Sequence, residues 1–370
     1  MKKIVFLSAK FYDFKNKCLT IGGVQSYLTA LINICKSLNI PLAFYQMGNY
    51  DDHTIYEGIN IQQIKVSNNN DQVFTNLVYQ FVTKQTNQNN IVAFYATESI
   101  VPKKMPFDNA IAIQHGISWD VPCDVKRSSF RRLISKLKRD HKIFCQVRNL
   151  NQMVCVDYNY VNWLRTQLDR ISTKLIVIPN YTKIAPIFEK PKGTVNIIFA
   201  RRLFEYRGTR VFATAIKRIL SEYPNIHVTI AGTGPDEDYM KRELASSSNI
   251  KFIKYRSSES LNIHADKHIA VVPTVGSEGT SLSLLEAMSA QCAVIASNVG
   301  GMTNIILDDY NGLMVNAGDA DDLYRAMKSL LDNPANIERL SKKAYETVKQ
   351  AFPYEKWAKK WTQVLKTIVE

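Results

Sequence analysis

Glu286 is the residue whose surroundings in the sequence point most directly to chemistry. It is the one charged residue in the stretch of 29 residues from Gly279 to Leu307, and its apolar neighbours predict a mostly buried helix over 281–290. A buried carboxylate is costly unless a neighbour donates a hydrogen bond to it. We therefore expect a partner for Glu286, which is either a bound ligand or, as the alternative, a core arginine or a backbone amide.

A second carboxylate, Glu278, stands eight residues before Glu286, in the predicted loop 276–281. Helical side chains lean toward the N-terminus of their helix, so Glu286, about one turn in, is expected to point back toward that loop. Two acceptor groups then gather beside a helix N-terminus, and helix N-termini attract phosphate groups. The pattern favours a phosphate-bearing ligand at this end of the helix.

Two arginines follow the predicted strand 195–200. Arg202 and Arg207 lie at its carboxyl end, where ligands bind in doubly wound sheets. Guanidinium groups bind phosphate oxygens in a bidentate manner, so the pair suits a diphosphate. As the alternative, both are surface arginines paired with Glu205. The register of the strand also leaves open whether Arg201 or Arg202 makes the contact.

Glycines follow strands in both halves of the chain. Gly232 and Gly234 come after the strand 226–231, but Glu237 stands where a dinucleotide fingerprint needs its third glycine, so that motif is incomplete. Gly22 and Gly23 precede a predicted helix. Each pair either lets the backbone approach a ligand closely or simply makes a turn.

His115 follows the predicted strand 109–114. A single histidine at the end of a strand has two ordinary uses. It can hold a structural hydrogen bond, or it can face a ligand at the carboxyl edge of the sheet. The residues around His115 leave both uses open.

Strands and helices alternate along the chain, which predicts an α/β fold built on parallel sheets. Strands are expected at 3–8, 41–46, 91–95, 109–114, 152–156, 174–178, 195–200, 226–231, 250–254, 268–273 and 292–296. Helices are expected at 24–38, 158–168, 208–222, 281–290, 319–332, 335–351 and 354–369.

The stretch 181–194 holds two prolines and a glycine with no apolar periodicity, and it predicts a linker. The 370 residues are enough for about two domains. We expect one domain over 1–180, a second over 195–352, and a helix over 353–370 that packs back on the first domain.

The composition favours a globular protein with an anionic partner. Hydrophobic residues make up 46% and charged residues 22% of the chain, and the formal net charge is +14. None of the six cysteines forms a C-x-x-C pair. The apolar run after Met1 is short and ends before Lys10, so it predicts a strand rather than a signal peptide. We expect reduced thiols and a cytoplasmic location.

The segment 126–148 carries nine basic residues against one acid, Asp140. Apolar residues form a possible stripe between them: Leu133, Ile134, Leu137 and Ile143. A basic amphipathic helix predicts contact with an anionic membrane surface, at the inner face of the membrane for a cytoplasmic protein. The alternative is a solvated helix face. No nucleic-acid recognition motif accompanies the charge, so nucleic acid is not expected as a partner.

Residues 278–288 read EGTSLSLLEAM, in which seven residues separate the two glutamates. This spacing and its surroundings resemble the E-x7-E signature of retaining glycosyltransferases, especially family 4 of the GT-B fold. The sequences VGG at 299–301 and NGLMV at 311–315 also resemble that family. The resemblance covers roughly 195–352 strongly and the first half of the chain weakly.

The resemblance implies roles for the donor site. Glu286 would hold the ribose hydroxyls of a nucleotide sugar, and Glu278 would lie near the donor sugar. Backbone amides around Leu282 and Ser283 would face the diphosphate. His115 would stand beside the donor sugar.

The same resemblance implies that Arg202 and Arg207 neutralise the leaving diphosphate, with Arg207 in the place of the usual lysine. The turn at Gly232 and Gly234 would approach the nucleotide, and the loop at Gly22 and Gly23 would reach the donor phosphate. Two further departures from the family pattern are Asn304, where a glutamate is frequent, and Tyr181, where a glycine often stands.

By resemblance, the fold is GT-B, with two Rossmann-like doubly wound domains facing across a cleft. The implied activity is retaining, metal-independent transfer of a hexose from a nucleotide-diphosphate sugar to a lipid-linked or growing cell-surface glycan. Among such donors, a UDP-sugar is the one expected. No cofactor is expected. The Asp-x-Asp triplets at 236–238 and 319–321 are candidate metal ligands, but they stand at helix starts, where acidic side chains interact favourably with the helix dipole. The rivals are a nucleotide-sugar 2-epimerase, a non-catalytic sugar-nucleotide-binding subunit and a nucleic-acid binder.

Overall fold

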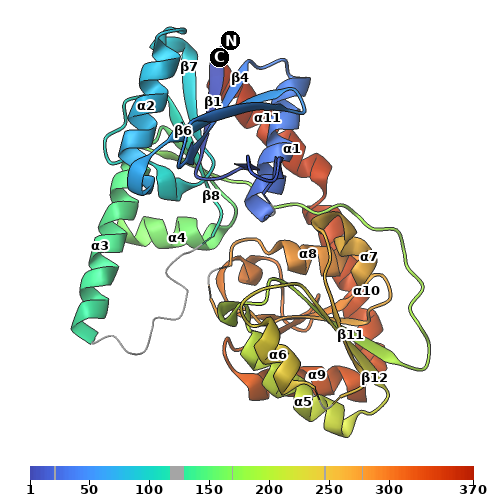
Figure 1. The fold of residues 1–370 in the computed structure, drawn as a ribbon. Helices are drawn as coiled ribbons and strands as arrows, with labels where there is room; N and C mark the ends of the chain where they lie inside the picture. The colour runs from blue at the N-terminus through green and yellow to red at the C-terminus, as the bar shows by residue number, and fades with distance from the viewer. Residues whose placement is uncertain (21, 117–128, 169, 246, 277) are drawn as a thin grey trace. The chain divides into compact units, whose positions relative to one another are not determined.

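The computed structural model describes residues 1–20, 22–116, 129–168, 170–245, 247–276 and 278–370. The chain divides into two compact units (Figure 1). Among the described residues, the first unit holds those of 1–115, 129–178 and 358–370, and the second holds Gly116 and those of 179–357. Within these described residues, no helix is both long and apolar enough to cross a bilayer.

The first unit is built on an eight-stranded sheet with the order β10-β9-β8-β7-β1-β4-β6-β5. Its strands are β1 (Lys3–Ser8), β4 (Leu42–Gly48), β5 (Asp52–Tyr56), β6 (Ile59–Lys65), β7 (Ile91–Tyr95), β8 (Ala110–Gln114), β9 (Gln152–Cys155) and β10 (Lys174–Val177). Neighbours are parallel except the edge pair β5 and β6. The central strands are continuous buried apolar runs, as parallel strands covered on both faces must be.

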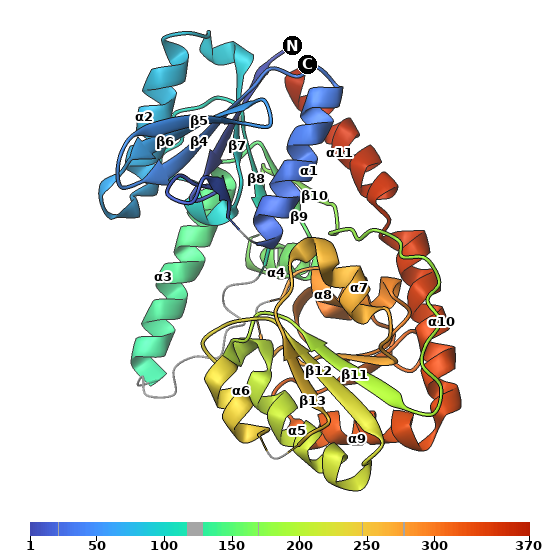
Figure 2. The same ribbon diagram turned by 45° about the vertical axis from the view of Figure 1, so that its right-hand side comes forward.

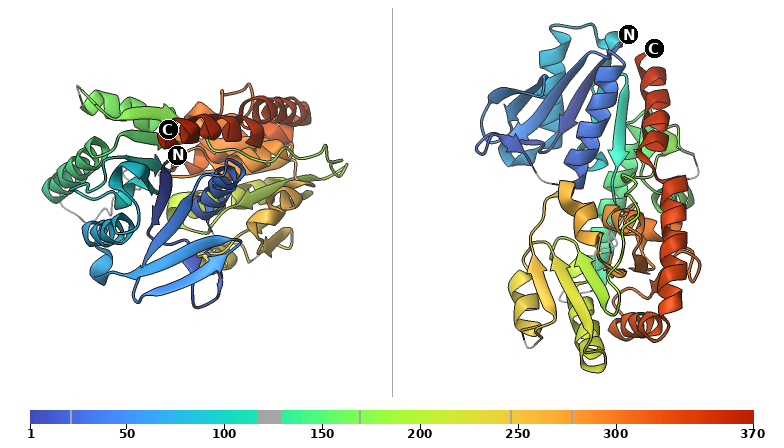
Figure 3. Two further views of the ribbon diagram at one scale, coloured as in Figure 1. Left: turned by 90° about the horizontal axis from the view of Figure 1, so that it is seen from above. Right: turned by 90° about the vertical axis from the view of Figure 1, so that its right-hand side faces the viewer.

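The helices assigned to this unit cover its sheet. They are α1 (Gly23–Ser37), α2 (Asp71–Thr83), α3 (Ser129–Arg148), α4 (Tyr158–Gln167) and most of α11 (Tyr354–Val369). Helices α1 and α11 lie side by side (Figure 2), and Trp361 Nε1 donates to the Tyr27 hydroxyl at 2.7 Å. The backbone amide of Lys2 donates to the Val369 carbonyl at 2.8 Å, so the two ends of the chain meet (Figure 3).

The second unit has a six-stranded parallel sheet with the order β13-β12-β11-β14-β15-β16. Its strands are β11 (Val195–Ala200), β12 (Ile226–Ala231), β13 (Ile250–Ile253), β14 (Ile269–Val272), β15 (Ala293–Ser297) and β16 (Leu313–Val315). Its helices are α5 (Thr209–Glu222), α6 (Glu237–Glu243), α7 (Ser260–His264), α8 (Leu282–Ser289), α9 (Ala320–Asp332) and α10 (Pro334–Ala351).

Short elements complete both units. The hairpin β2 (Tyr12–Asp13) and β3 (Cys18–Leu19) stands apart from the large sheet. The 3₁₀ helices are η1 (Ser67–Asn69), η2 (Gln88–Asn90), η3 (Glu98–Ile100), η5 (Glu205–Arg207), η6 (Ser257–Glu259) and η7 (Gly300–Asn304).

Two hydrophobic cores lie on opposite faces of the second sheet. Along β11, Ile197 and Phe199 join the core with α5, α6 and α9, while Ile198 and Ala200 join the core with α8 and α10. This alternation follows from the two-residue repeat of a strand. Because helices cover both faces, the carboxyl edge of the sheet is the part left to form a site.

The strands and helices predicted above by their residue ranges are all present, and their ends lie within two residues of the expected ones. The elements that the sequence did not predict include α2 and the edge strand β5. Helix α2 is rich in β-branched and aromatic residues, which favour strands, and its helical state follows from burying Phe74, Val78 and Val82 on one side.

The segment 181–194, expected as a linker, differs from that expectation because it packs against the second unit. Ala185 donates its backbone amide to Ser289 Oγ at 2.8 Å, and Ser289 Oγ donates to the Lys183 carbonyl at 2.7 Å. A side chain on α8 therefore holds this segment in place, and proline content alone did not indicate it. Residues 179–194 are called the arm below.

Candidate functional site

The carboxyl edge of the second sheet carries a buried cluster of opposite charges. Glu278 is 8% exposed and accepts hydrogen bonds from Arg201 Nη2 at 2.7 Å, from Arg207 Nη1 and from Thr274 Oγ1 at 3.0 Å. Arg201 also donates to the Thr274 hydroxyl. These four residues are called the Glu278 cluster. They follow or end β11, η5 and β14, so one carboxylate joins three segments at the edge where ligands of such sheets bind.

The Glu278 cluster has one more positive than negative charge. Burial alone would raise the pKa of Glu278, but the Arg201 and Arg207 cations lower that pKa below its ordinary value. The carboxylate is therefore ionised at neutral pH and cancels one of the two cations. The buried Arg201 Nε has no hydrogen-bond partner among the described residues. This excess cation suits an anionic ligand.

Glycines fix the backbone on which the cluster is built. Gly300 has φ of +53°, and a Cβ there would lie 1.9 Å from the Glu278 carbonyl oxygen. The amide of Gly301 donates to that same oxygen at 2.9 Å. Gly208, with φ of +85°, approaches the Pro273 carbonyl just as closely. Only glycine permits these approaches, so the positions of Glu278 and Arg207 depend on them.

The structure places the predicted pair of arginines in different surroundings. Arg207 belongs to the Glu278 cluster, whereas Arg202 is exposed and its guanidinium lies 5.5 Å from the centroid of the Phe204 ring. Successive side chains of an extended backbone point to opposite sides, so Arg201 turns inward and Arg202 outward. Glu205, the alternative partner, pairs with Arg210 at 3.3 Å instead.

Glu286 lies in the second turn of α8, and its partner is a serine on another helix. Ser260 Oγ donates to Glu286 Oε2 at 2.6 Å. The side chain remains partly exposed, while burial raises its pKa to about 7. A serine hydroxyl, rather than the core arginine considered from the sequence, is therefore the partner in this contact. A carboxylate with one hydroxyl partner retains acceptor capacity for further donors.

The N-terminus of α8 lies between the two glutamates in the sequence. Ser281 is its N-cap, and its hydroxyl accepts from the Leu284 amide at 3.4 Å. The amides of Leu282 and Ser283 belong to the first turn, where helix geometry supplies no intrahelical acceptor. They are consequently available, by position, to an anionic group.

The turn with Gly232 and Gly234 packs tightly against the start of the Glu278 cluster. A Cβ at Gly232, where φ is +143°, would lie 2.0 Å from the Arg201 carbonyl oxygen, and one at Gly234 would lie 2.3 Å from that of Leu203. These glycines thus let two backbone segments meet. This is the strand-to-helix turn foreseen as the alternative, and it leaves a role in nucleotide approach as a prediction.

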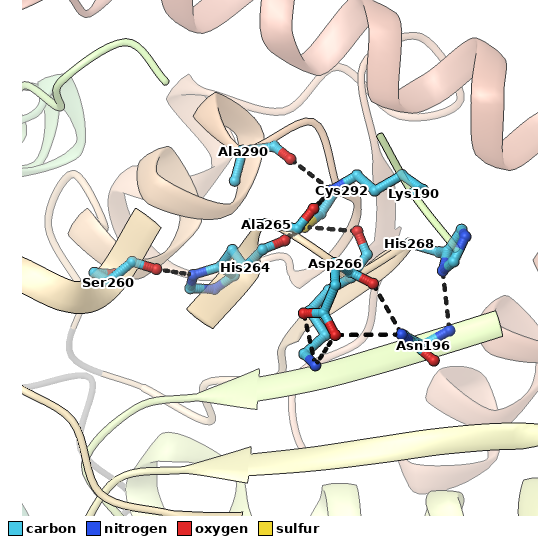
Figure 4. A network of polar contacts seen from close by, with 10 residues as sticks. Lys190, Asn196, Ser260, His264, Ala265, Asp266, His268, Ala290 and Cys292 are labelled. Atoms are coloured by element: carbon cyan, nitrogen blue, oxygen red, sulfur yellow. Dashed lines mark hydrogen bonds and ion pairs between the residues drawn. The ribbon is translucent and has the colours of Figure 1, made fainter. Parts of the chain in front are cut away.

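Lys190 of the arm binds the ends of two helices (Figure 4). Its Nζ donates to the carbonyls of Ala265 at 2.9 Å, Ala290 at 2.8 Å and His264 at 3.3 Å. These carbonyls close α7 and α8, where a cation is favourable. Because α7 carries Ser260 and α8 carries Glu286, Lys190 holds together the two helices that form that pair.

Two histidines and an Asp-x-Asp triplet of the second unit make contacts to the backbone. His264 Nδ1 lies 2.7 Å from the Ser260 carbonyl, and His268 Nδ1 accepts from the Asn196 amide at 3.0 Å. Asp319 caps α9 through the amides of Asp321 and Asp322. In the part of the chain that the structure describes, no three His, Cys, Asp or Glu side chains gather into a group that could hold a metal ion.

The remaining predicted residues belong to the first unit. Gly22 caps α1 and Gly23 begins it. His115 follows β8, its Nε2 lies 3.0 Å from the Ala96 carbonyl, and its ring meets Tyr27 edge-on at 5.1 Å. Burial lowers the pKa of His115 to about 4, so it is neutral at pH 7. The structural use of this histidine is visible, and the functional one stays a prediction.

Sequence reasoning missed three polar residues of interest. Thr274 and Ser260 bind the two glutamates, but no spacing relates either to its partner because each comes from a different element. Glu98, in η3 after β7, is a partly exposed carboxyl whose pKa burial raises to about 7. The signal for Glu98 was its position after a buried strand.

Residues 180–347, somewhat less than half of the chain, match the family described as glycosyl transferases group 1. Phosphatidyl-myo-inositol mannosyltransferase of Mycolicibacterium smegmatis is 24% identical over 178 residues, which is 46% of this chain and 46% of the relative. D-inositol 3-phosphate glycosyltransferase of an Arthrobacter species is 28% identical over 153 residues, which is 39% of this chain and 36% of the relative. The chain thus spans about half the length or less of these curated relatives.

Solved structures resemble the whole chain. Sucrose-phosphate synthase from Thermosynechococcus elongatus has a TM-score of 0.75 at 17% identity, covering 100% of this chain and 99% of its own. Anabaena HepE in complex with UDP-glucose has a TM-score of 0.71 at 14% identity, covering 99% and 100%. Residues 180–347 therefore match glycosyl transferases group 1, and the chain as a whole has the GT-B fold with two Rossmann-like domains.

Proposed function

We propose that this protein is a retaining glycosyltransferase that moves a hexose from a nucleotide-diphosphate sugar to a lipid-linked or growing cell-surface glycan. The observation that carries the proposal is the Glu278 cluster with its excess cation, which stands just before the N-terminus of α8. The family match over 180–347 supports glycosyl transfer. UDP is the favoured nucleotide, because HepE, a protein of the same fold, was solved with UDP-glucose.

The diphosphate of the donor would bind at the start of α8. The first-turn amides of Leu282 and Ser283 offer donors, and Arg207 adds a cation from the Glu278 cluster. The exposed Arg202 has no ion-pair partner among the described residues, so its guanidinium is the one most easily turned toward a ligand. Together these groups oppose the charge that develops on the leaving diphosphate.

Glu286 would hold the ribose of the donor. Two vicinal hydroxyls can donate to the two oxygens of one carboxylate, and Ser260 already orients that carboxylate through Oε2. Glu278 would lie by the donor sugar with its charge kept negative by two arginines. His115, neutral at pH 7, would exchange a hydrogen bond with a sugar hydroxyl rather than carry charge.

In the proposed reaction, the bond between C1 of the sugar and the phosphate oxygen breaks, and its electron pair leaves with the nucleoside diphosphate. The acceptor hydroxyl oxygen forms the new bond to C1 from the same face, and its proton passes to the departing diphosphate. An α-linked donor therefore gives an α-linkage. No metal ion takes part in this proposal, and EDTA is expected to leave the rate unchanged.

A direct assay tests this function. The protein is incubated with UDP-hexoses and candidate glycan acceptors, and release of UDP is followed with and without acceptor. The anomeric configuration of the product is then read by NMR. Acceptor-dependent UDP release with an α-product supports the proposal, and a β-product contradicts the retaining mechanism.

The same assay separates the rivals. A nucleotide-sugar 2-epimerase changes the donor without any acceptor. A non-catalytic subunit binds the nucleotide and shows a thermal shift with UDP but turns nothing over.

We also infer a cytoplasmic site of action. It is supported by the free thiols of the described cysteines, Cys18, Cys35, Cys145, Cys155 and Cys292.

A further inference from the structure

The N-terminal half of α3 presents a stripe of large apolar side chains to solvent. The exposed fractions are 71% for Phe130, 53% for Leu133, 37% for Ile134 and 59% for Leu137. At 100° per residue, these positions fall within an arc of about 100° on the helix surface. Apolar residues scattered singly over a surface need no explanation, but a continuous stripe of this kind marks a contact site.

The other half of the same helix is firmly packed. Ile143 and Val147 are buried, and Gln146 Nε2 donates to the carbonyls of Ser99 and Val101 at 3.0 Å each. Figure 1 shows the N-terminal half of α3 running on past the sheet of its own unit. The C-terminal half of α3 is therefore anchored, while the apolar stripe on its N-terminal half is exposed and none of the described residues buries it.

Cations flank the stripe. Lys136 and Lys138 are exposed and, by helical geometry, lie about 100° to either side of its midline. The sequence adds Arg131 and Arg132 to this segment, and no acid occurs from 129 to 139. The first acid, Asp140, is buried. Residues 126–128 of the basic segment expected from the sequence lie outside the described residues.

We propose that residues 130–138 form a contact surface for an anionic lipid bilayer. The apolar stripe would enter the boundary between headgroups and acyl chains, while the flanking lysines would meet lipid phosphates. The two features belong together, because charge alone would serve a nucleic acid and an apolar stripe alone would serve a protein partner. The proposal goes beyond sugar transfer and does not depend on it.

Vesicle co-sedimentation of the whole protein tests the surface. Vesicles are made from phosphatidylcholine alone or with a third of phosphatidylglycerol, at about 0.1 M and about 1 M salt, where the Debye length falls from about 10 Å to about 3 Å. We expect pelleting with the anionic vesicles at low salt. The double variant Lys136→Glu/Lys138→Glu should lower the partition coefficient at least 30-fold or so, because each lysine near an anionic surface contributes about 1 kcal/mol.

Matched variants separate the two parts of the surface. Leu133→Ser/Leu137→Ser should also lose binding, whereas Ile187→Ser/Leu307→Ser, which removes exposed apolar groups elsewhere, should not. Lys342→Glu/Lys359→Glu repeats the charge change at two other exposed lysines and should retain binding. Circular dichroism and an unchanged thermal unfolding midpoint confirm that each variant folds.

Three outcomes overturn the proposal. The first is equal recovery of wild type and both α3 variants in the supernatant. The second is equal pelleting with neutral and anionic vesicles. The third is retention on duplex nucleic acid that the lysine variant loses while the leucine variant keeps it, with no vesicle binding. The third outcome would assign the charge to nucleic acid.

Discussion

The Ser260 hydroxyl donates to the Glu286 carboxylate across 2.6 Å, and this contact joins α7 to α8. A short helix thereby orients the one charged side chain of an apolar stretch. Glu286 stays partly exposed, and burial raises its pKa to about 7, although the hydrogen bond from Ser260 by itself lowers that pKa. Both the binding and the stability of the protein should follow from that change.

Nucleotide affinity should depend on pH around neutrality. Because burial raises the pKa of Glu286 to about 7, this carboxyl is largely protonated below pH 7 and ionised above it. The ionised form accepts ribose hydroxyls better, so affinity for a UDP-hexose, whose diphosphate does not titrate in this range, should increase as the pH rises from 6 to 8. Calorimetry at several pH values measures this. Glu286→Gln should bind the UDP-hexose roughly 10–150-fold more weakly with a flat profile, and a flat wild-type profile would exclude the ribose role.

The same glutamate should cost stability when no ligand is bound. Its pKa is higher in the folded state, about 7, than the ordinary 4.5, so the folded protein holds the proton more tightly. The free energy of unfolding therefore falls as the pH rises from about 4.5 to about 7, by about 3 kcal/mol for this group. At pH 8, Glu286→Gln should raise the unfolding midpoint. Glu278→Gln should lower it, because its pKa is depressed and the buried Arg201 and the partly buried Arg207 lose their partner.

Substitution of the arginines should separate turnover from stability. Arg202→Ala should lower kcat/KM roughly 100- to 1,000-fold, as loss of one donor to a developing negative charge does, with little change in the unfolding midpoint. Arg201→Ala should destabilise the protein by about 3–5 kcal/mol, because it leaves a buried carboxylate with one cation fewer. Arg207→Lys keeps the charge and should be milder than Arg202→Ala. A fully active Arg202→Ala would instead assign the diphosphate contact to the Glu278 cluster.

Lys190 should act as a positioning residue for Glu286. Lys190→Met removes three hydrogen bonds to the ends of α7 and α8. We expect the KM for the donor to rise roughly tenfold while kcat stays near the wild-type value, since a hydrogen bond from a charged group is worth about 1.5–3 kcal/mol. Lys190→Arg should restore the KM. Lys192→Met, at an exposed neighbour, is the control. An unchanged KM in Lys190→Met would show that Lys190 only attaches the arm and does not position Glu286.

Gly232 should tolerate no side chain. In Gly232→Ala the new Cβ would lie 2.0 Å from the Arg201 carbonyl, so the backbone under the Glu278 cluster must shift, at a cost of about 1–3 kcal/mol. Gly193→Ala is the matched control, because it also has positive φ but its Cβ would meet nothing within 4 Å. Thermal unfolding and UDP binding should both suffer in Gly232→Ala. Equal effects in both variants would attribute the loss to φ strain alone.

The sequence predicted the fold well because its strands are continuous apolar runs between glycines and prolines, as at Val195–Ala200. It singled out Glu286 because a lone charge in an apolar helix demands a partner, and Glu278 by its place in the loop before that helix. It did not predict that Ser260 is that partner, because a contact between α7 and α8 depends on tertiary packing. The same holds for Lys190, whose role requires two helix ends to converge.

Choosing between Arg201 and Arg202 illustrates the limit more closely. Both follow β11, and the motif alone cannot say which one turns inward. The answer depends on the pleat of the strand and on a buried acceptor, Glu278, that lies 77 residues further along the chain. This contact cannot be predicted from the sequence alone, because it requires the pairing of β11 with β14 in the folded sheet.

Trp361 delays completion of the first unit's core until the second unit has been synthesised. This fully buried side chain lies among Tyr27 and Phe94 in the first unit, yet the ribosome makes it only after residues 179–357. At about 5–20 residues per second, that delay is on the order of ten seconds or more. The second unit therefore emerges whole while the first still lacks part of its core. During this interval the rings of Tyr27 and Phe94 lack the indole that packs against them in the folded unit.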